Sequence, residues 1–106
     1  MVSAKNNQRE AQAWVVVPLF NEAEVVGPVI KELTQYFQHV VCVDDGSTDG
    51  SAGIAEKAGA RVLRHPLNLG QGAALQTGFD YISAQPDVSH IVTFDADGQH
   101  VVSDAL

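Results

Sequence analysis

The sequence predicts an α/β domain built on a mainly parallel β-sheet. Short apolar runs rich in β-branched residues alternate along the chain with amphipathic stretches of helical length. The first two runs are almost continuously apolar, and turn residues follow every run. Strands that alternate with helices are joined by right-handed crossovers, which place the strands parallel in one sheet.

Four apolar runs are expected to be the strands. The nearly unbroken apolar character of the first two is typical of strands that helices cover on both faces. We expect Cys42, which lies in the second run, to be a buried small apolar residue rather than a nucleophile. In chain order the runs are Trp14–Val17, Val40–Val43, Arg61–Leu63 and His90–Phe94.

Three stretches between these runs are expected to be helices. In the first, apolar residues recur every four positions from Val25 to Phe37, which makes one apolar face. The predicted helices are Glu24–Phe37, Thr48–Ala58 and Gly70–Ala84.

Local signals suggest how the first two helices begin. Asn21 followed by Glu24 resembles a capping box. Pro28 would cost about 3 kcal/mol inside a helix, so we expect a short first turn and a helix that restarts with Pro28 as its first residue. Ser47 or Thr48 is expected to cap the second helix.

The composition limits the class of protein. The chain has 106 residues, the size of one domain, and its 13 acidic and 6 basic residues give a net charge of −7. This balance argues against a nucleic-acid-binding protein, which usually presents a basic face. One cysteine excludes an intramolecular disulfide, and no apolar run approaches the roughly 18 residues of a membrane span. The polar N-terminal segment has no apolar signal core, so we expect a cytoplasmic protein.

The domain boundaries follow from the same patterns. We expect residues 1–12 to be a polar tail and residues 13–106 to form the domain. A further element begins at Val101, only six residues before the end of the sequence, so we expect the N-terminal part of a longer domain. Apolar surface that the remaining part would cover is expected to promote self-association.

Polar clusters follow all four predicted strands. In open parallel sheets, ligands bind at the carboxyl ends of the strands, which meet at one edge. Loops at that edge can carry chemistry while the sheet holds them in place. The clusters are Pro18–Glu22, Asp44–Asp49, His65–Gly72 and Asp95–His100.

The last cluster has the spacing of a metal site. In an extended segment, Asp95 and Asp97 point the same way, and both carboxylates can converge on one hard cation such as Mg²⁺ or Mn²⁺. Gln99 could add a neutral oxygen ligand. The alternative is a simple turn after a strand, with Gly98 providing the tight bend.

The other clusters leave two interpretations open. Either Asp44 or Asp45 can accept hydrogen bonds from a base or a ribose, or the pair belongs to a helix start, where acidic charge is favourable. Residues 68–72 (Asn-Leu-Gly-Gln-Gly) can approach a phosphate or can simply lead into a helix. Residues 18–22 can form the wall of a base pocket, with Glu22 as an acceptor, or a strand exit. His65 is expected to be an ordinary loop residue.

Four segments resemble the motifs of the family 2 glycosyltransferases, most closely those of the dolichyl- and polyprenyl-phosphate mannosyl- and glucosyltransferases. The motifs stand in the order and spacing of that family, and the resemblance covers residues 13–106. It implies a GT-A fold, a Rossmann-like three-layer sandwich that binds nucleotide sugars. The segments are Val15–Glu22, Val43–Gly50, Asn68–Gly70 and Asp95–His100.

The resemblance also implies a donor site for a sugar linked to GDP or UDP. Asp95, Asp97 and Gln99 would hold Mg²⁺ or Mn²⁺, which neutralises the diphosphate as it leaves. Of the acidic pair, Asp45 is preferred over Asp44. The nucleotide-sugar-binding residues would be Pro18, Phe20, Glu22, Asp44 or Asp45, and Asp95.

The acceptor implied by the resemblance is a molecule such as a polyprenyl phosphate, which would attack the anomeric carbon with inversion. That acceptor would bring the full-length protein to a membrane face. Members of the family are longer than this chain, and their general base follows the D-x-D motif. We therefore assign no catalytic base to this chain.

Two other classes fit the sequence less well. A receiver-like signalling module shares the length and the strand-end acidic pair, but it needs a lysine at a later strand end, and no lysine follows Lys57. A dinucleotide oxidoreductase would carry G-x-G-x-x-G after the first strand, and that motif is missing there.

Overall fold

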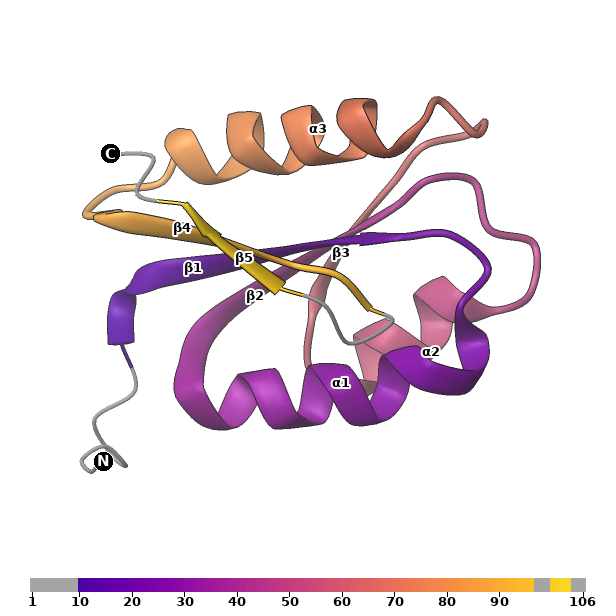
Figure 1. Ribbon diagram of the computed structural model, residues 1–106, viewed down its shortest axis with the longest axis horizontal. Coiled ribbons are helices and arrows are strands. Elements are labelled where there is room, and N and C mark those ends of the chain that lie inside the picture. The colour runs from indigo at the N-terminus through magenta and orange to yellow at the C-terminus, as the bar shows by residue number, and fades with distance from the viewer. Residues whose placement is uncertain (1–9, 97–99, 104–106) are drawn as a thin grey trace.

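A computed structural model describes residues 10–96 and 100–103, and these form one five-stranded sheet with helices on both faces (Figure 1). The elements in chain order are β1 (Glu10–Leu19), α1 (Ala23–Tyr36), β2 (Phe37–Asp44), α2 (Ser51–Ala58), β3 (Arg61–Arg64), α3 (Gln71–Ser83), β4 (His90–Phe94) and β5 (His100–Ser103). The predicted α/β fold is confirmed. β1 begins inside the segment expected to be a tail, because Glu10 already pairs with Phe37 of β2.

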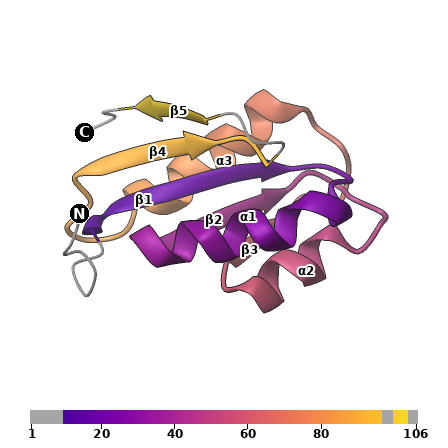
Figure 2. The same cartoon turned by 60° about the horizontal axis from the view of Figure 1, so that its bottom comes forward.

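The strand order is β3-β2-β1-β4-β5, with β1 to β4 parallel and β5 antiparallel to β4. From β1 the chain winds outward to β3, and α1 and α2 cover one face of the sheet (Figures 1 and 2). It then crosses back to β4, and α3 covers the other face. The winding direction therefore reverses between β1 and β4, and in sheets of this kind ligands bind at the carboxyl ends of the strands at that point.

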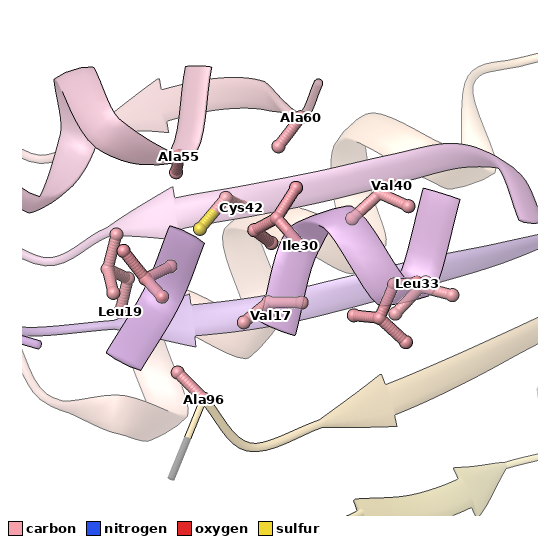
Figure 3. Packing of buried hydrophobic residues seen from close by; sticks show 11 residues of the cluster. Val17, Leu19, Ile30, Leu33, Val40, Cys42, Ala55, Ala60 and Ala96 are labelled. Carbon is pink, nitrogen blue, oxygen red and sulfur yellow. The ribbon is translucent and has the colours of Figure 1, made fainter. Parts of the chain in front are cut away.

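Two apolar clusters hold the three layers together. The side chains of β1 and β2 alternate between the two faces, as extended strands require. Val15, Val17 and Cys42 pack under α1 and α2, and Cys42 is fully buried among aliphatic neighbours, as predicted (Figure 3). Val16, Val41 and Val43 pack under α3 together with Trp14, which stacks on His39 with ring centroids 4.0 Å apart.

The predicted break in the first helix is wrong. α1 runs without interruption from Ala23 to Tyr36 with Pro28 inside it. A proline ring normally clashes with the Cβ of a helical residue before it, but the preceding residue is Gly27, which has no Cβ. Val26 and Ile30, on either side of the proline, are fully buried against the sheet, and this packing favours a continuous helix.

At Gly78, α3 approaches the sheet closely, and this contact gives a testable prediction. A Cβ atom there would lie 2.3 Å from Cγ2 of Val16. Because Val16 is fully buried and cannot move aside, we expect Gly78→Ala to lower the free energy of unfolding by about 1–3 kcal/mol. The measurement is urea denaturation.

Gly72→Ala is the matched control in the same helix. A Cβ at Gly72 meets nothing within 4 Å, and alanine favours helix, so this change should be neutral or stabilise the chain by up to about 1 kcal/mol. Equal unfolding midpoints for the two variants would show that α3 can shift away from β1 without cost.

Candidate functional site

The loops that follow all four parallel strands meet around one cavity of about 390 Å³, at the reversal point between β1 and β4. Ala74 of α3 and Leu19 of β1 contribute apolar surface to it. The cavity is lined by Pro18, Leu19, Phe20, Glu22, Asp45, Asn68, Gly70, Gln71, Ala74 and Asp95. The prediction that the polar clusters share one edge of the sheet is therefore confirmed for the described residues.

The structure brings together most of the predicted donor-site residues. Pro18 comes from the end of β1, and Phe20 and Glu22 come from the loop after it. Asp45 directly follows β2, and Asp95 directly follows β4. Phe20 lines the cavity while 44% of its surface is exposed, so its ring is accessible to a bound molecule. The remaining members of the predicted set, Asp97 and Gln99, lie outside the described residues.

The Asp45 side chain accepts three hydrogen bonds at the cavity. Its Oδ1 accepts hydrogen bonds from Nδ1 of His65 at 2.8 Å and from the backbone N–H of Leu69 at 2.9 Å. Its Oδ2 accepts from the backbone N–H of Gly70 at 2.8 Å. The carboxylate thus holds in place the loop that leads into α3.

These hydrogen bonds determine the charge state of Asp45. Burial acts to raise the pKa of this carboxyl group, because only 3% of the residue is exposed. The hydrogen bonds from His65, Leu69 and Gly70 outweigh burial and hold the pKa below its ordinary value. Asp45 is therefore an anion, and it can only accept hydrogen bonds.

Asp44 lies on the other side of the strand. Alternation along β2 puts Asp45 on the face of Val43 and Asp44 on the face of Cys42, away from α3. Asp44 is buried and does not line the cavity, and its Oδ1 has no hydrogen-bond partner in the described part of the chain. Burial, helped by the charges of Asp44 and Glu22, raises the pKa of the Cys42 thiol to about 12, so this cysteine is not a nucleophile at neutral pH.

The loop after β1 is joined to the loop after β2 by hydrogen bonds between backbone N–H groups and side-chain oxygens. The N–H of Asn21 donates to Oγ of Ser47 at 2.8 Å, and Oδ1 of Asn21 accepts from the N–H of Thr48 at 2.9 Å. The N–H of Glu22 donates to Oγ of Ser51 at 2.9 Å. The wall that contains Phe20 and Glu22 is therefore fixed by residues from the second cluster.

The start of α1 is capped from the same loop. The N–H of Ala23 donates to Oδ2 of Asp49 at 3.1 Å, while the hydroxyl and N–H of Ser51 donate to Oδ1 of Asp49. The hydrogen bond from the Ser51 hydroxyl is the main cause that holds the pKa of Asp49 below its ordinary value.

Both capping predictions are wrong, because the residues expected to cap the helices form other hydrogen bonds or lie before the helix begins. Asn21 does not form a capping box with Glu24, because its side chain is used by Thr48 and its backbone is left-handed, with φ of 50°. Ser47 and Thr48 do not cap the second helix, because α2 begins only at Ser51 and Gly50 precedes it without a side-chain cap.

Sequence reasoning missed the part played by His65. Its ring joins Asp45 to Thr77 of α3, with Nε2 of His65 lying 2.8 Å from Oγ1 of Thr77. The signal was present, since His65 directly follows β3 at the correct edge of the sheet. Its partners lie 20 residues before it and 12 residues after it, and no local pattern indicates them. Asn68 of the same loop and Gln71, the first residue of α3, also line the cavity.

Within the described ranges, no group of three His, Cys, Asp or Glu side chains is placed to hold a metal ion. The one D-x-D carboxylate in those ranges, Asp95, does face the cavity. No helix among the described residues is both long enough and apolar enough to span a membrane.

Comparisons with known proteins agree with this architecture. The sequence matches the family described as glycosyl transferase family 2 over residues 14–104. An uncharacterised protein of Methanocaldococcus jannaschii is 44% identical over 97 residues, which are 90% of this chain and 39% of that protein. The polyprenol monophosphomannose synthase of Mycolicibacterium smegmatis is 34% identical over 96 residues, covering 81% of this chain and 35% of the synthase.

Solved structures show the same similarity. Glucosyl-3-phosphoglycerate synthase from Mycobacterium tuberculosis, in a complex with Mn²⁺, UDP and glucosyl-3-phosphoglycerate, superposes with a TM-score of 0.67 at 25% identity. The match covers 88% of this chain and 35% of that structure. The chain therefore spans well under half the length of the proteins that it resembles.

Proposed function

Since this chain belongs to glycosyl transferase family 2, we propose that its cavity binds the nucleoside diphosphate of a nucleotide-sugar donor for glycosyl transfer. The observation that carries the proposal is the convergence of four strand-end loops on one cavity, with Phe20, Glu22, Asp45 and Asp95 on its wall. Binding at the reversal point of a parallel sheet is typical of nucleotide-binding folds.

Each side chain can be given a role from its chemistry. The exposed ring of Phe20, beside Pro18, offers an apolar surface to the flat face of a base. A carboxylate has about four acceptor positions, and Asp45 uses three of them within the chain. The fourth is left for an N–H group of the base. Glu22 supplies a further acceptor at the cavity wall.

The diphosphate end of the donor needs positive charge, which the cavity's own carboxylates do not supply. The N-terminus of α3 at Gly70 and Gln71 brings the positive end of a helix dipole to the cavity. Asp95 faces the same space, and its oxygen chemistry fits Mg²⁺ or Mn²⁺. We propose that Asp95, Asp97 and Gln99 hold such an ion, which would neutralise the leaving diphosphate.

We propose a phosphate-bearing lipid of the polyprenyl phosphate class as the acceptor, attacking with inversion at the anomeric carbon. The name of the mycobacterial polyprenol monophosphomannose synthase supports this class. The donor in this proposal is a GDP- or UDP-linked hexose, and UDP is the nucleotide bound in the solved relative.

Titration calorimetry of the chain with UDP and with GDP tests the donor site. We expect one of them to bind about tenfold more tightly with Mn²⁺ than with a chelator, a difference of about 1.4 kcal/mol. Asp95→Asn should lose this enhancement because it removes a charged ligand. Asp80→Asn should keep the enhancement by Mn²⁺. Asp80 is an exposed residue of α3, and its side chain pairs with Gln76. Equal affinities with Mn²⁺ and with chelator would contradict the metal site.

A further inference from the structure

His65 connects three parts of the molecule that lie far apart in the sequence, through its backbone and its ring. Its backbone N–H donates to the carbonyl of Asp44 at the end of β2. Its ring contacts Asp45 through Nδ1 and Thr77 of α3 through Nε2, both at 2.8 Å. The ring is nearly buried, with 10% of the side chain exposed, so water does not compete strongly for either contact.

The hydrogen-bonding capacities of Asp45 and Thr77 determine which ring nitrogen of His65 donates and which accepts. Oδ1 of Asp45 also accepts the N–H of Leu69, so it acts as an acceptor and His65 donates from Nδ1. In the neutral ring, Nε2 then accepts the hydroxyl hydrogen of Thr77. The Asp45 carboxylate thereby selects the ring tautomer with hydrogen on Nδ1, and the Thr77 hydroxyl stabilises that tautomer by donating to Nε2.

His65 and Thr77 are not among the residues that line the cavity, whereas Asp45 is. A group that a ligand touches is precise only when neighbouring hydrogen bonds fix its orientation. Here the His65 ring orients the Asp45 carboxylate together with the N–H groups of Leu69 and Gly70. The hydroxyl of Thr77 in turn contacts the other nitrogen of the ring.

We propose that His65 and Thr77 are positioning residues of the nucleotide site: together they orient the Asp45 carboxylate and hold the loop of Leu69 and Gly70 against it. This inference rests on the proposed function only for the identity of the ligand. The arrangement itself can be tested without any ligand.

Thr77→Val is the decisive variant because it keeps the shape of the side chain and removes its hydroxyl. We expect UDP or GDP, whichever the wild type binds, to bind about 3- to 10-fold more weakly. The amides of Leu69 and Gly70 should exchange with solvent about 3- to 10-fold faster, as expected for the loss of one hydrogen bond. Thr77→Ser, which restores the hydroxyl, should behave like the wild type in both measurements.

Two substitutions of His65 separate its two contacts. The amide of Asn can reach the position of Nδ1, and that of Gln the position of Nε2. His65→Asn should therefore keep most of the protection of Leu69 and Gly70, whereas His65→Gln should lose it. In the wild type, the ¹⁵N chemical shifts of the ring should report the tautomer with hydrogen on Nδ1.

A failure of this inference can be distinguished from a failure of the proposed function. If the wild type binds neither nucleotide, the proposed function fails, and amide exchange and the ring tautomer still decide the positioning role. If Thr77→Val only lowers the unfolding midpoint and leaves both nucleotide affinity and the exchange of the two amides unchanged, His65 and Thr77 merely attach α3 to the sheet and the inference is overturned. Gln76→Ala, on the exposed side of the same helix, controls for a general loosening of α3.

Discussion

Replacing Asp45 with alanine is expected to lower the free energy of unfolding by about 3–5 kcal/mol, because it removes the acceptor of three partly buried hydrogen bonds. Three donors lose their partner at once: Nδ1 of His65 and the N–H groups of Leu69 and Gly70. Urea denaturation at neutral pH measures the loss. Nucleotide binding should disappear in the same variant, since both the acceptor and the loop that it holds are affected.

The pH dependence of stability provides a second measurement on Asp45. Its pKa is lower in the folded chain than the ordinary value of about 3.9, so its contribution is complete above about pH 5. The contribution is lost as the pH falls below about 3.9 and through the folded pKa. Asp45→Asn should therefore show a shallower loss of stability in acid than the wild type, and parallel curves in that range would contradict the assignment.

Replacing Gly46 with alanine is expected to cost about 3 kcal/mol, for two reasons. Its φ of 83° lies in the left-handed region, where a side chain costs about 1–2 kcal/mol. A Cβ would also lie 2.8 Å from backbone atoms of Leu67 and Asn68, which cannot rotate away. The measurement is again urea denaturation, followed by nucleotide titration, because the displaced loop lines the cavity.

Gly50→Ala separates the two causes. Gly50 has nearly the same φ, 85°, but a Cβ there meets nothing within 4 Å. It should lose only the 1–2 kcal/mol of backbone strain and keep nucleotide affinity. If the two variants lose equal stability, the contact between Gly46 and the loop of Leu67 and Asn68 does not matter for folding.

The strands could be predicted from the sequence because their signal is local. Continuous apolar runs such as Trp14–Val17 are buried on both faces whatever their neighbours are. Helix starts could not be predicted in the same way. The N–H groups of Glu22 and Ala23 are satisfied by Ser51 and Asp49, which lie more than 25 residues away in the chain, so the local pattern at Asn21 was misleading.

The position of the candidate site was predictable for a topological reason. Parallel strands place all their carboxyl ends at one edge, so clusters after four strands must lie near one another. The different positions of Asp44 and Asp45 relative to the cavity were harder to predict, because they depend on which strand face each residue occupies. The role of Asp97 and Gln99 is still a prediction, since the described residues do not include them.

The hydrogen bonds between the loops after β1 and β2 have a consequence for protein engineering. Exchanging residues 18–22 with those of a relative, in order to change donor preference, would keep the backbone N–H groups that donate to Ser47 and Ser51. It would remove the acceptor of the Thr48 N–H unless the graft also carries Asn at position 21. A graft therefore keeps these three hydrogen bonds between the two segments when it retains Asn21 and leaves residues 47–51 unchanged. The side chain at position 21 is therefore the one to preserve when the wall beside the cavity is redesigned.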